Sequence, residues 1–362
     1  RQHAAYYLAL GEAAEPQLRG PQQARWMARL EQEHNNLRAV LAWSQSAAAT
    51  DGQAGELGAR LSVAVWEFWS RRGYQSEGRR WLAGALTQVA VDSTEPEARR
   101  LRANVLSAAG NLALYQSDAV AGRTLLEESL ALFQELGDSW GIAYVLLNLG
   151  VSYHQQDDLR QAERLIEQSL ASFRTLGDSW GIAWALRFLM GVHADAAGSG
   201  DSQHQSSRVM VLLEESLVHF RAVGDLFGIA AALGSLGSIA AKQGDDRRAH
   251  VLLAESLALK HEVGGRLGVA RTLMDFAGLV AAQGQQRAEL ERATRLYAAA
   301  EALEDSISFV YANVDGAAHQ RTIAMLRTQL SEAAFAAAWA AGQAMTLEQA
   351  IADALADEAK SS

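Results

Sequence analysis

The sequence predicts an all-α fold, a right-handed α-solenoid in which helix pairs stack between helical segments at the two ends. Three observations predict it. Two short phrases recur four times at matching intervals, as in repeat architectures. The 362 residues include three prolines, all within the first hundred residues, so the rest of the chain can be helical throughout. Each copy of the repeat also carries a glycine where one helix would stop and the next begin.

The first phrase is Gly-Asp-Ser-Trp-Gly-Ile-Ala, at 137–143 and again at 177–183. It returns as Gly-Asp-Leu-Phe-Gly-Ile-Ala at 224–230 and more loosely at 264–270. The second phrase, Glu-Ser-Leu or Gln-Ser-Leu, stands shortly before each copy, at 128–130, 168–170, 215–217 and 255–257. Both phrases are spaced by 40, 47 and 40 residues, so they belong to one repeating unit.

Each unit is predicted to be two antiparallel helices with a very short connection. In the segment 159–170, apolar or small residues at 159, 162, 166, 169 and 170 keep helical spacing. Gly177 suits the left-handed position that ends this helix. Asp178 or Ser179 would then cap the next helix with a side-chain oxygen. Short connections place neighbouring helices side by side, and repetition stacks them into a solenoid.

The expected organisation has three parts. A helical segment covers residues 1–50, a solenoid of about six helix pairs covers 51–304, and capping helices cover 305–362. The polar, glycine-containing stretch 195–207 explains the single 47-residue interval, and we expect an inserted loop there. Thr346 and Gln349 form the pattern of a capping box for the last helix. Because the chain does not begin with Met, we expect it to be a piece of a longer protein.

Composition excludes several classes of protein. Hydrophobic residues make up 49% of the chain and charged residues 20%, unlike a disordered segment. There is no cysteine, which excludes disulfides and thiolate chemistry. Residues 1–105 carry 13 arginines and 11 acidic residues, whereas the remainder carries 19 basic and 31 acidic residues. Most of the chain would therefore repel nucleic acid and anionic membranes, and with no signal-peptide core or membrane span we expect a cytoplasmic protein.

The repeats resemble tetratricopeptide repeats. That pattern combines a large apolar residue, a Leu-Gly pair, an aromatic residue three positions later and small or aliphatic residues in the second helix. One unit supplies all of these at Leu146, Leu149, Gly150, Tyr153, Ala162, Ile166 and Ser169. The resemblance covers roughly residues 55–304, although the period exceeds the usual 34 residues or so. It implies a solenoid whose first helices line a concave groove, and it does not specify a function.

A narrower resemblance lies at the two ends. The segments 3–10 and 30–39 look like the lead into the repeats of large bacterial regulators, and the segments 335–342 and 347–350 are similar to the ends of those proteins. Such regulators couple a signal-transduction ATPase to a C-terminal tetratricopeptide array, often with a DNA-binding domain elsewhere. This resemblance implies the sensor region of a bacterial signalling or transcriptional regulator.

No catalytic signature emerges from the sequence. The nucleotide-binding, zinc-protease, EF-hand and nucleophile-elbow motifs are all absent, so we expect neither an enzyme, a metal site nor a cofactor. His154 and His193 fall in neighbouring first helices, without acidic residues at ligand spacing on those helices. Trp140, Trp180 and Phe227 occupy one repeat position, which we interpret as packing at the repeat junctions.

Counting from Gly150 predicts which side chains of the first helices face the groove. Aromatic, Asn and Arg side chains in such a row can bind an extended peptide or stack on a small polar ligand. The candidate groove residues are Asn111, Tyr115, Tyr144, Asn148, His154, Trp184, Arg187, Arg271 and Asp275.

Two hypotheses for function follow. In the first, the groove is a sensor that binds a peptide, a partner protein or a small-molecule effector. In the second, the array is a constitutive scaffold for protein–protein interaction, with no small-molecule signal. Neither involves direct contact with nucleic acid or with a membrane. The sequence identifies neither the ligand or partner nor the oligomeric state, and it does not define the domains that accompany this piece.

Overall fold

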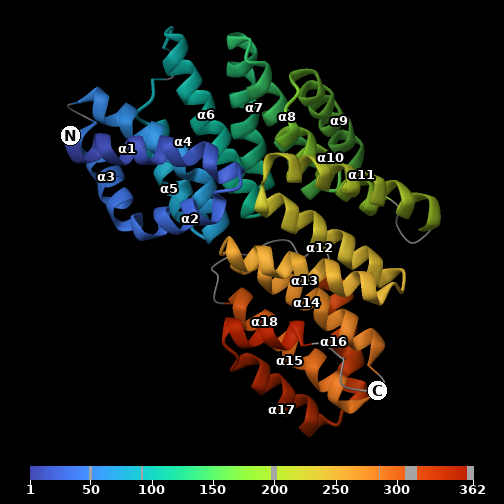
Figure 1. The fold of residues 1–362 in the computed structure, drawn as a ribbon. Coiled ribbons are helices and arrows are strands. Elements are labelled where there is room, and N and C mark those ends of the chain that lie inside the picture. Colours follow the sequence, from blue (N-terminus) through green and yellow to red (C-terminus); the bar gives the residue numbers. More distant parts are fainter. Residues whose placement is uncertain (49–50, 91–92, 197–201, 285, 306–315, 357–362) are drawn as a thin grey trace. The chain divides into compact units, whose positions relative to one another are not determined.

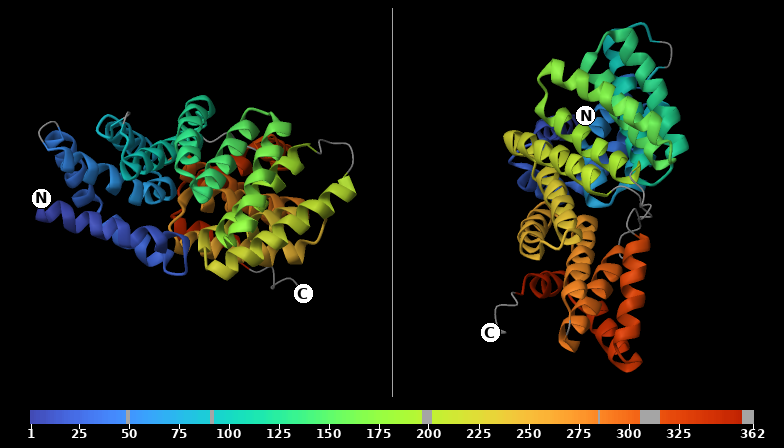
Figure 2. Two further views of the ribbon diagram at one scale, coloured as in Figure 1. Left: turned by 90° about the horizontal axis from the view of Figure 1, so that it is seen from above. Right: turned by 90° about the vertical axis from the view of Figure 1, so that its right-hand side faces the viewer.

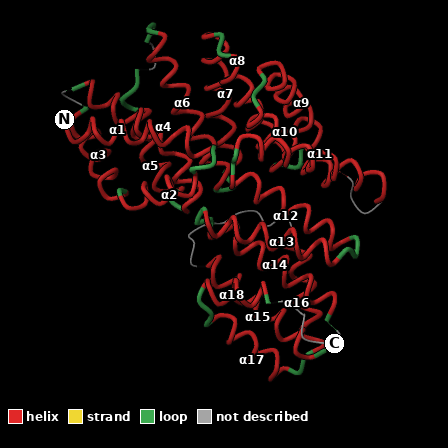
Figure 3. The backbone as a smooth tube through the Cα atoms, in the orientation of Figure 1, coloured by secondary structure: helices red, strands yellow, loops and turns green. Residues whose placement is uncertain are grey.

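The computed structural model describes residues 1–48, 51–90, 93–196, 202–284, 286–305 and 316–356. All regular structure in these residues is helical (Figures 1 and 3), which confirms the predicted all-α class. In chain order the helices are α1 (Gln2–Ala14), the 3₁₀-helix η1 (Glu15–Arg19), α2 (Gln23–Gln32), α3 (His34–Ala47), α4 (Gly52–Arg72), α5 (Gln75–Leu86), α6 (Pro96–Tyr115), α7 (Ala119–Leu136), α8 (Ser139–Gln155), α9 (Leu159–Leu176), α10 (Ser179–Ala196), α11 (Ser202–Val223), α12 (Leu226–Lys242), α13 (Asp246–Glu262), α14 (Arg266–Gln283), α15 (Arg287–Asp305), α16 (Gly316–Gln329), α17 (Glu332–Gln343) and α18 (Leu347–Leu355).

The chain divides into two compact units, Arg1–Gly228 and Ile229–Ser362. Unit 1 contains the N-terminal helices and the helix pairs α4/α5, α6/α7, α8/α9 and α10/α11, while unit 2 contains most of α12, its partner α13, the pair α14/α15 and the last three helices. We call the first helix of each pair an A helix and the second a B helix. The predicted boundaries at 50 and 304 stay predictions. Of the predicted loop, residues 202–207 are helical in α11, and 197–201 lie outside the described residues.

Each Gly-Asp turn ends a B helix and begins the next A helix. Gly177 adopts a left-handed conformation with φ of 69°, which glycine reaches without steric cost. Its amide donates to the carbonyl of Arg174, and the amide of Asp178 donates to that of Phe173, as in a Schellman motif. Asp178 Oδ1 then accepts from the Gly181 amide and caps α10. The structure thus confirms the glycine prediction and selects Asp178 over Ser179 as the cap.

The same aspartates also join one repeat to the next. Trp140 Nε1 donates to Asp178 Oδ2 at 2.8 Å, and Trp180 Nε1 donates to Asp225 Oδ2 at 3.1 Å. Each carboxylate therefore uses one oxygen to cap its own helix and the other to accept from the preceding repeat. The two indole rings also stack, with centroids 6.4 Å apart. The interpretation of the recurring aromatic position as a junction contact is therefore confirmed for this pair.

The recurring serine of the second phrase bonds the two helices of a pair. Ser169 Oγ in α9 donates to the carbonyl of Ala143 in α8 at 2.7 Å, and Ser129 and Ser256 make the corresponding bonds to Ala103 and Ala230. All three serines are fully buried, where an unpaired hydroxyl would be unfavourable. This bond requires close approach of the two helices, which explains why the position is small in every repeat.

Three further helices cover the last helix pair in unit 2. A continuous apolar core runs from Ala240 through α14 and α15 to Ala354 in α18. Thr346 and Gln349 form the predicted capping box at the start of α18. At the other end of this helix, Arg292 of α15 donates to the carbonyls of Asp353, Ala354 and Ala356. Backbone groups at both ends of α18 thus have side-chain hydrogen-bond partners. In the described part of the chain, no helix combines the length and apolar character needed to cross a membrane.

The glycine near the start of each A helix generates a stability prediction. A Cβ at Gly181 would lie 2.3–2.4 Å from the Phe173 ring, whereas one at Gly191 in the same helix would have its nearest neighbour at 3.4 Å. We expect Gly181→Ala to destabilise unit 1 by about 1–3 kcal/mol through overpacking. Gly191→Ala should be neutral or stabilise by up to about 1 kcal/mol through helix propensity. Thermal unfolding followed by circular dichroism tests this, and equal midpoints for the two variants would contradict it.

Candidate functional site

The candidate site is the inner face of unit 1. Seen from above, α4 to α11 follow an arc, and the N-terminal helices cross its open side (Figure 2, left). The hydrogen bonds agree, because Gln23 at the start of α2 bonds to Asp225, some 200 residues later. The A helices α4, α6, α8 and α10, together with the first residues of α12, therefore face η1.

A row of aromatic rings runs across α8, α10 and the start of α12. Trp140 stacks on Tyr144, with centroids 5.1 Å apart and an interplanar angle of 12°. The centroid of the Trp180 ring lies 6.4 Å from that of Trp140 and 6.2 Å from that of Trp184. The Trp184 ring in turn lies 6.1 Å from the ring of Phe227. Trp140, Trp180 and Phe227 are only half-buried, so the row offers ring faces to a planar or cationic group.

Arg19 of η1 is the group that these rings contact in this structure. Its guanidinium carbon lies 4.3 Å from the ring centroid of Trp180, 5.4 Å from that of Trp140 and 6.0 Å from that of Tyr144. Its Nε donates to the nearly buried carboxylate of Glu67 at 2.5 Å. We call Glu67, Trp140, Tyr144 and Trp180 the guanidinium cage.

Other residues fix the backbone around Arg19. The side chain of Leu18 is fully buried, and its carbonyl accepts from Arg71 and from Gln23. Gln23 is fully buried as well, and it bonds both to Asp225 Oδ1 at 3.1 Å and to the amide of Phe227 at 2.8 Å. The segment on either side of Arg19 is thus held by apolar burial and by four hydrogen bonds that do not involve the Arg19 side chain.

A cavity of about 130 Å³ adjoins the guanidinium cage. Its walls come from η1, α4, α6, α7 and α8, and they include Glu15, Arg19, Asn104 and Ser107. Ser107 is buried, and among the described residues its hydroxyl has no hydrogen-bond partner. The same holds for the buried indole nitrogen of Trp184, further along the inner face. Buried polar atoms are usually satisfied, so these two atoms are available to a bound group.

Burial shifts the ionisation of the groups around the cage. Burial opposes the charged form of Arg19, but Glu67, reinforced by its hydrogen bond, outweighs this and holds the pKa of Arg19 above its ordinary value. Burial also raises the pKa of the Tyr144 hydroxyl. The pKa of Glu15 is likewise raised by burial, with Glu67 adding to the effect and Arg19 opposing it. The site therefore favours one tightly held cation beside carboxylates.

The structure brings several of the predicted groove residues together. Asn111 Nδ2 donates to the Tyr144 hydroxyl at 3.3 Å, and Asn148 Nδ2 donates to the Tyr144 carbonyl. The Arg187 guanidinium lies 5.9 Å from the ring centroid of Trp184. These five residues lie on α6, α8 and α10, which face η1 in unit 1.

Of the other predicted residues, two lie near helix ends in unit 1 and two lie in unit 2. Tyr115 is half-buried at the end of α6, and His154 bonds to Asp195 at 2.6 Å near the ends of α8 and α10. Arg271 and Asp275 lie on α14, in unit 2. His193 bonds to Glu163 rather than to His154. Among the described residues, no three His, Asp or Glu side chains gather as metal ligands would.

Sequence reasoning did not place Arg19, Trp140 and Trp180 in the candidate site. The two tryptophans carry a repeat signal, and that signal alone indicates packing. Arg19 carries none, because it precedes the repeats and stands between Pro16 and the Gly20-Pro21 pair. Its ring contacts are made with residues more than a hundred positions away.

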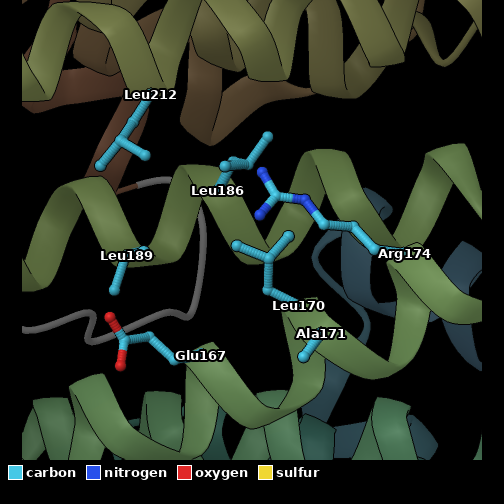
Figure 4. A pocket seen from close by; sticks show the side chains of 7 residues that line it. All are labelled: Glu167, Leu170, Ala171, Arg174, Leu186, Leu189 and Leu212. Carbon is cyan, nitrogen blue, oxygen red and sulfur yellow. The ribbon is translucent and has the colours of Figure 1, made fainter.

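A larger cavity, of about 500 Å³, lies between α9, α10 and α11 (Figure 4). The leucines at 170, 186, 189 and 212 point into it, and Arg174 at its edge is paired with Glu215 at 2.8 Å. None of its lining side chains holds a buried polar atom without a partner. The smaller site differs from it, because apolar surface is combined there with oriented polar groups, as is usual in ligand sites.

Comparison with known proteins agrees with this architecture. A tetratricopeptide repeat model matches residues 101–175, which span nearly all of α6 to α9. The match and the fold confirm the predicted tetratricopeptide repeat array. No curated protein matches the sequence.

Three solved structures show the same fold at low sequence identity. A Rap protein complexed with Competence and Sporulation Factor has a TM-score of 0.60 at 10% identity, covering 98% of this chain and 100% of that one. Aspartyl phosphate phosphatase F from Bacillus subtilis has a TM-score of 0.52 at 8% identity, covering 91% and 94%. The apo quorum sensor NprR from B. thuringiensis has a TM-score of 0.50 at 14% identity, covering 98% of each chain.

The raised pKa of Glu15 predicts that replacing this residue changes the thermal stability by an amount that depends on pH. A carboxyl group whose pKa is higher in the folded state stabilises the fold at low pH, and this contribution is lost as pH rises through the raised pKa. We expect Glu15→Gln to raise the thermal midpoint slightly at pH 7, and the gain to shrink towards about pH 4. Glu56→Gln is the control, because exposed Glu56 pairs with Arg60 and its loss should give no gain. A gain for Glu15→Gln that persists unchanged in acid would refute the explanation.

Proposed function

We propose that unit 1 recognises a peptide, or an extended segment of a partner protein, on its inner face. The observation that carries this proposal is that the face already accommodates a chain segment, η1, by the kinds of contact a peptide would make. A guanidinium binds to a carboxylate and aromatic rings, a backbone carbonyl accepts from Arg71, and a leucine side chain is buried. The unpartnered atoms of Ser107 and Trp184 offer further hydrogen bonds to a ligand.

The setting that we propose is the sensor region of a cytoplasmic bacterial signalling or transcriptional regulator. The resemblance of the N-terminal and C-terminal segments to such regulators supports this. The fold likeness is compatible with it, because one of the similar structures is a Rap protein complexed with Competence and Sporulation Factor and another is called a quorum sensor. Binding would act on an attached module only if the ligand has different affinities for two conformations.

The role that we propose is binding rather than catalysis. The carboxylate at the centre of the site, that of Glu67, is already bound by the guanidinium groups of Arg19 and Arg71. The groups around it are aromatic rings and amides, which suit recognition.

The constitutive scaffold remains a second candidate, and one observation favours it. The helix α11, whose Leu212 lines the larger cavity, also exposes Val211 and Val218, at 60% and 66% of their surface. Apolar side chains beside an apolar hollow are typical of protein contact surfaces. A scaffold that uses this outer surface would bind its partner independently of the inner face, so variants of the two surfaces separate the hypotheses.

Binding of a fluorescein-labelled positional library of pentapeptides, measured by fluorescence anisotropy on the full chain, tests the proposed function. For a bound sequence, Trp184→Phe should weaken affinity about tenfold, because it removes the unpartnered indole donor while an aromatic ring remains. The control is Trp81→Phe, because the Trp81 indole donates to Glu77 outside the inner face. Equal affinities in both variants would place the ligand elsewhere, and a library without any binder would leave the scaffold hypothesis ahead.

A further inference from the structure

Resting on the proposed function, we propose that the guanidinium cage recognises an arginine side chain of the ligand. In this structure Arg19 is an internal occupant of that site, and the ligand arginine takes its place. The inference specifies the chemical class of ligand that the inner face selects, and it identifies the group with which the ligand competes.

The cage matches a guanidinium better than other cations. A guanidinium is planar and weakly hydrated, so it can stack on ring faces and still donate in its own plane to a carboxylate. The cage provides both partners, with the rings of Trp140 and Trp180 stacked 6.4 Å apart and Glu67 accepting from Arg19 Nε. An ammonium group is a compact, strongly hydrated charge that cannot stack in this way.

The charge balance of the site also requires a cation in the cage. The Glu67 carboxylate accepts from Arg19 at one oxygen and from Arg71 at the other, the latter at 2.7 Å. If Arg19 left and nothing replaced it, this nearly buried carboxylate would lose half of its pairing, beside a second carboxyl group, Glu15. A buried charge without its partner is costly, so the vacated position would favour a new guanidinium.

Exchange does not require the N-terminal segment to unfold. The neighbours of Arg19 are held independently, Leu18 by burial and Gln23 by its bonds to Asp225 and Phe227. The Arg19 side chain keeps 22% of its surface exposed, and the cavity of about 130 Å³ lies beside it. Rotation of one long side chain would therefore free the cage, while η1 remains in place as one wall of the site.

An internal occupant lowers the apparent affinity for a ligand. The ligand binds only to the fraction of molecules whose cage is free, so its apparent dissociation constant rises in inverse proportion to that fraction. Removing the Arg19 side chain should therefore strengthen arginine binding. A residue with a purely structural role would not produce a gain of binding when it is deleted.

The test uses the full chain with Arg19→Ala and N-acetyl-L-arginine amide as the probe. We expect the probe to raise the thermal midpoint of Arg19→Ala and to change its tryptophan fluorescence, both saturably, with a dissociation constant at least tenfold lower than for the unmodified chain. N-acetyl-L-citrulline amide has a similar shape without the charge, and N-acetyl-L-lysine amide has the charge without the plane. Both should bind at least tenfold more weakly.

Two further variants make the result specific. Glu67→Gln added to Arg19→Ala should abolish the gain. Arg29→Ala is the matched control, because Arg29 lies over Trp26, with 5.2 Å to the ring centroid, and makes no contact with the cage, so this variant should respond like the unmodified chain. If Arg19→Ala does not fold, Arg19→Gln preserves a hydrogen-bond donor and removes the charge, and it should show the same gain.

The possible outcomes separate this inference from the proposed function. Equal probe affinity in Arg19→Ala and the unmodified chain, or equal affinity for the arginine and lysine amides, would overturn the inference. Library peptides that lack arginine but depend on Trp184 would also overturn it, and they would leave the proposed function intact. Library binders enriched in arginine at one position, together with the gain in Arg19→Ala, would support both.

Discussion

Two hydrogen bonds made by one carboxylate organise the repeats of unit 1. Asp178 caps α10 with one oxygen and accepts from Trp140 with the other, so the start of one A helix is bonded to the previous one. The fourth copy of the Gly-Asp phrase, at 264–270, has no aspartate and shows what changes without these two bonds. Gly265 replaces the aspartate and gives α14 no side-chain cap, and Lys260 takes the place of the phenylalanine and bonds to Thr272. The repeat keeps its helices there, although the bonds between repeats differ.

Local features of this fold were predictable from the sequence because they depend on neighbouring residues. A glycine with positive φ, a capping aspartate and a buried serine each act on helices that are adjacent in the chain, and the period of about 40 residues makes them recognisable. Helical spacing likewise predicted that Tyr144, Asn148 and Trp184 share one face. The position of the N-terminal segment could not be predicted in this way, because Gln23 has no repeat equivalent and bonds to a residue 202 positions away.

The candidate site likewise combines features that the repeats predict with one that they do not. The A-helix side chains could be assigned from periodicity, yet their chemistry depends on a residue outside the repeats. Without Arg19, the row of rings on α8 and α10 would suggest only packing. With Arg19 beside Glu67, the row becomes a binding surface for a cation. The chemistry of this inner face is therefore determined as much by the segment that crosses its open side as by the repeats themselves.

The long separation between Gln23 and Asp225 also imposes an order on folding. Each repeat contacts mainly its neighbours, so the helix pairs of unit 1 can form as the chain leaves the ribosome. Gln23 cannot bond to Asp225 until the 202 residues that separate them have been synthesised. At a synthesis rate of about 5–20 residues per second this takes roughly 10–40 s. During that interval η1 can already be held on α4 by its bonds to Arg71 and Glu67, whereas the bonds from Gln23 to Asp225 and Phe227 are still missing. The bond between Gln23 and Asp225 is thus among the last contacts that unit 1 can form, and it joins the N-terminal segment to the third Gly-Asp turn only when the repeats between them have been synthesised.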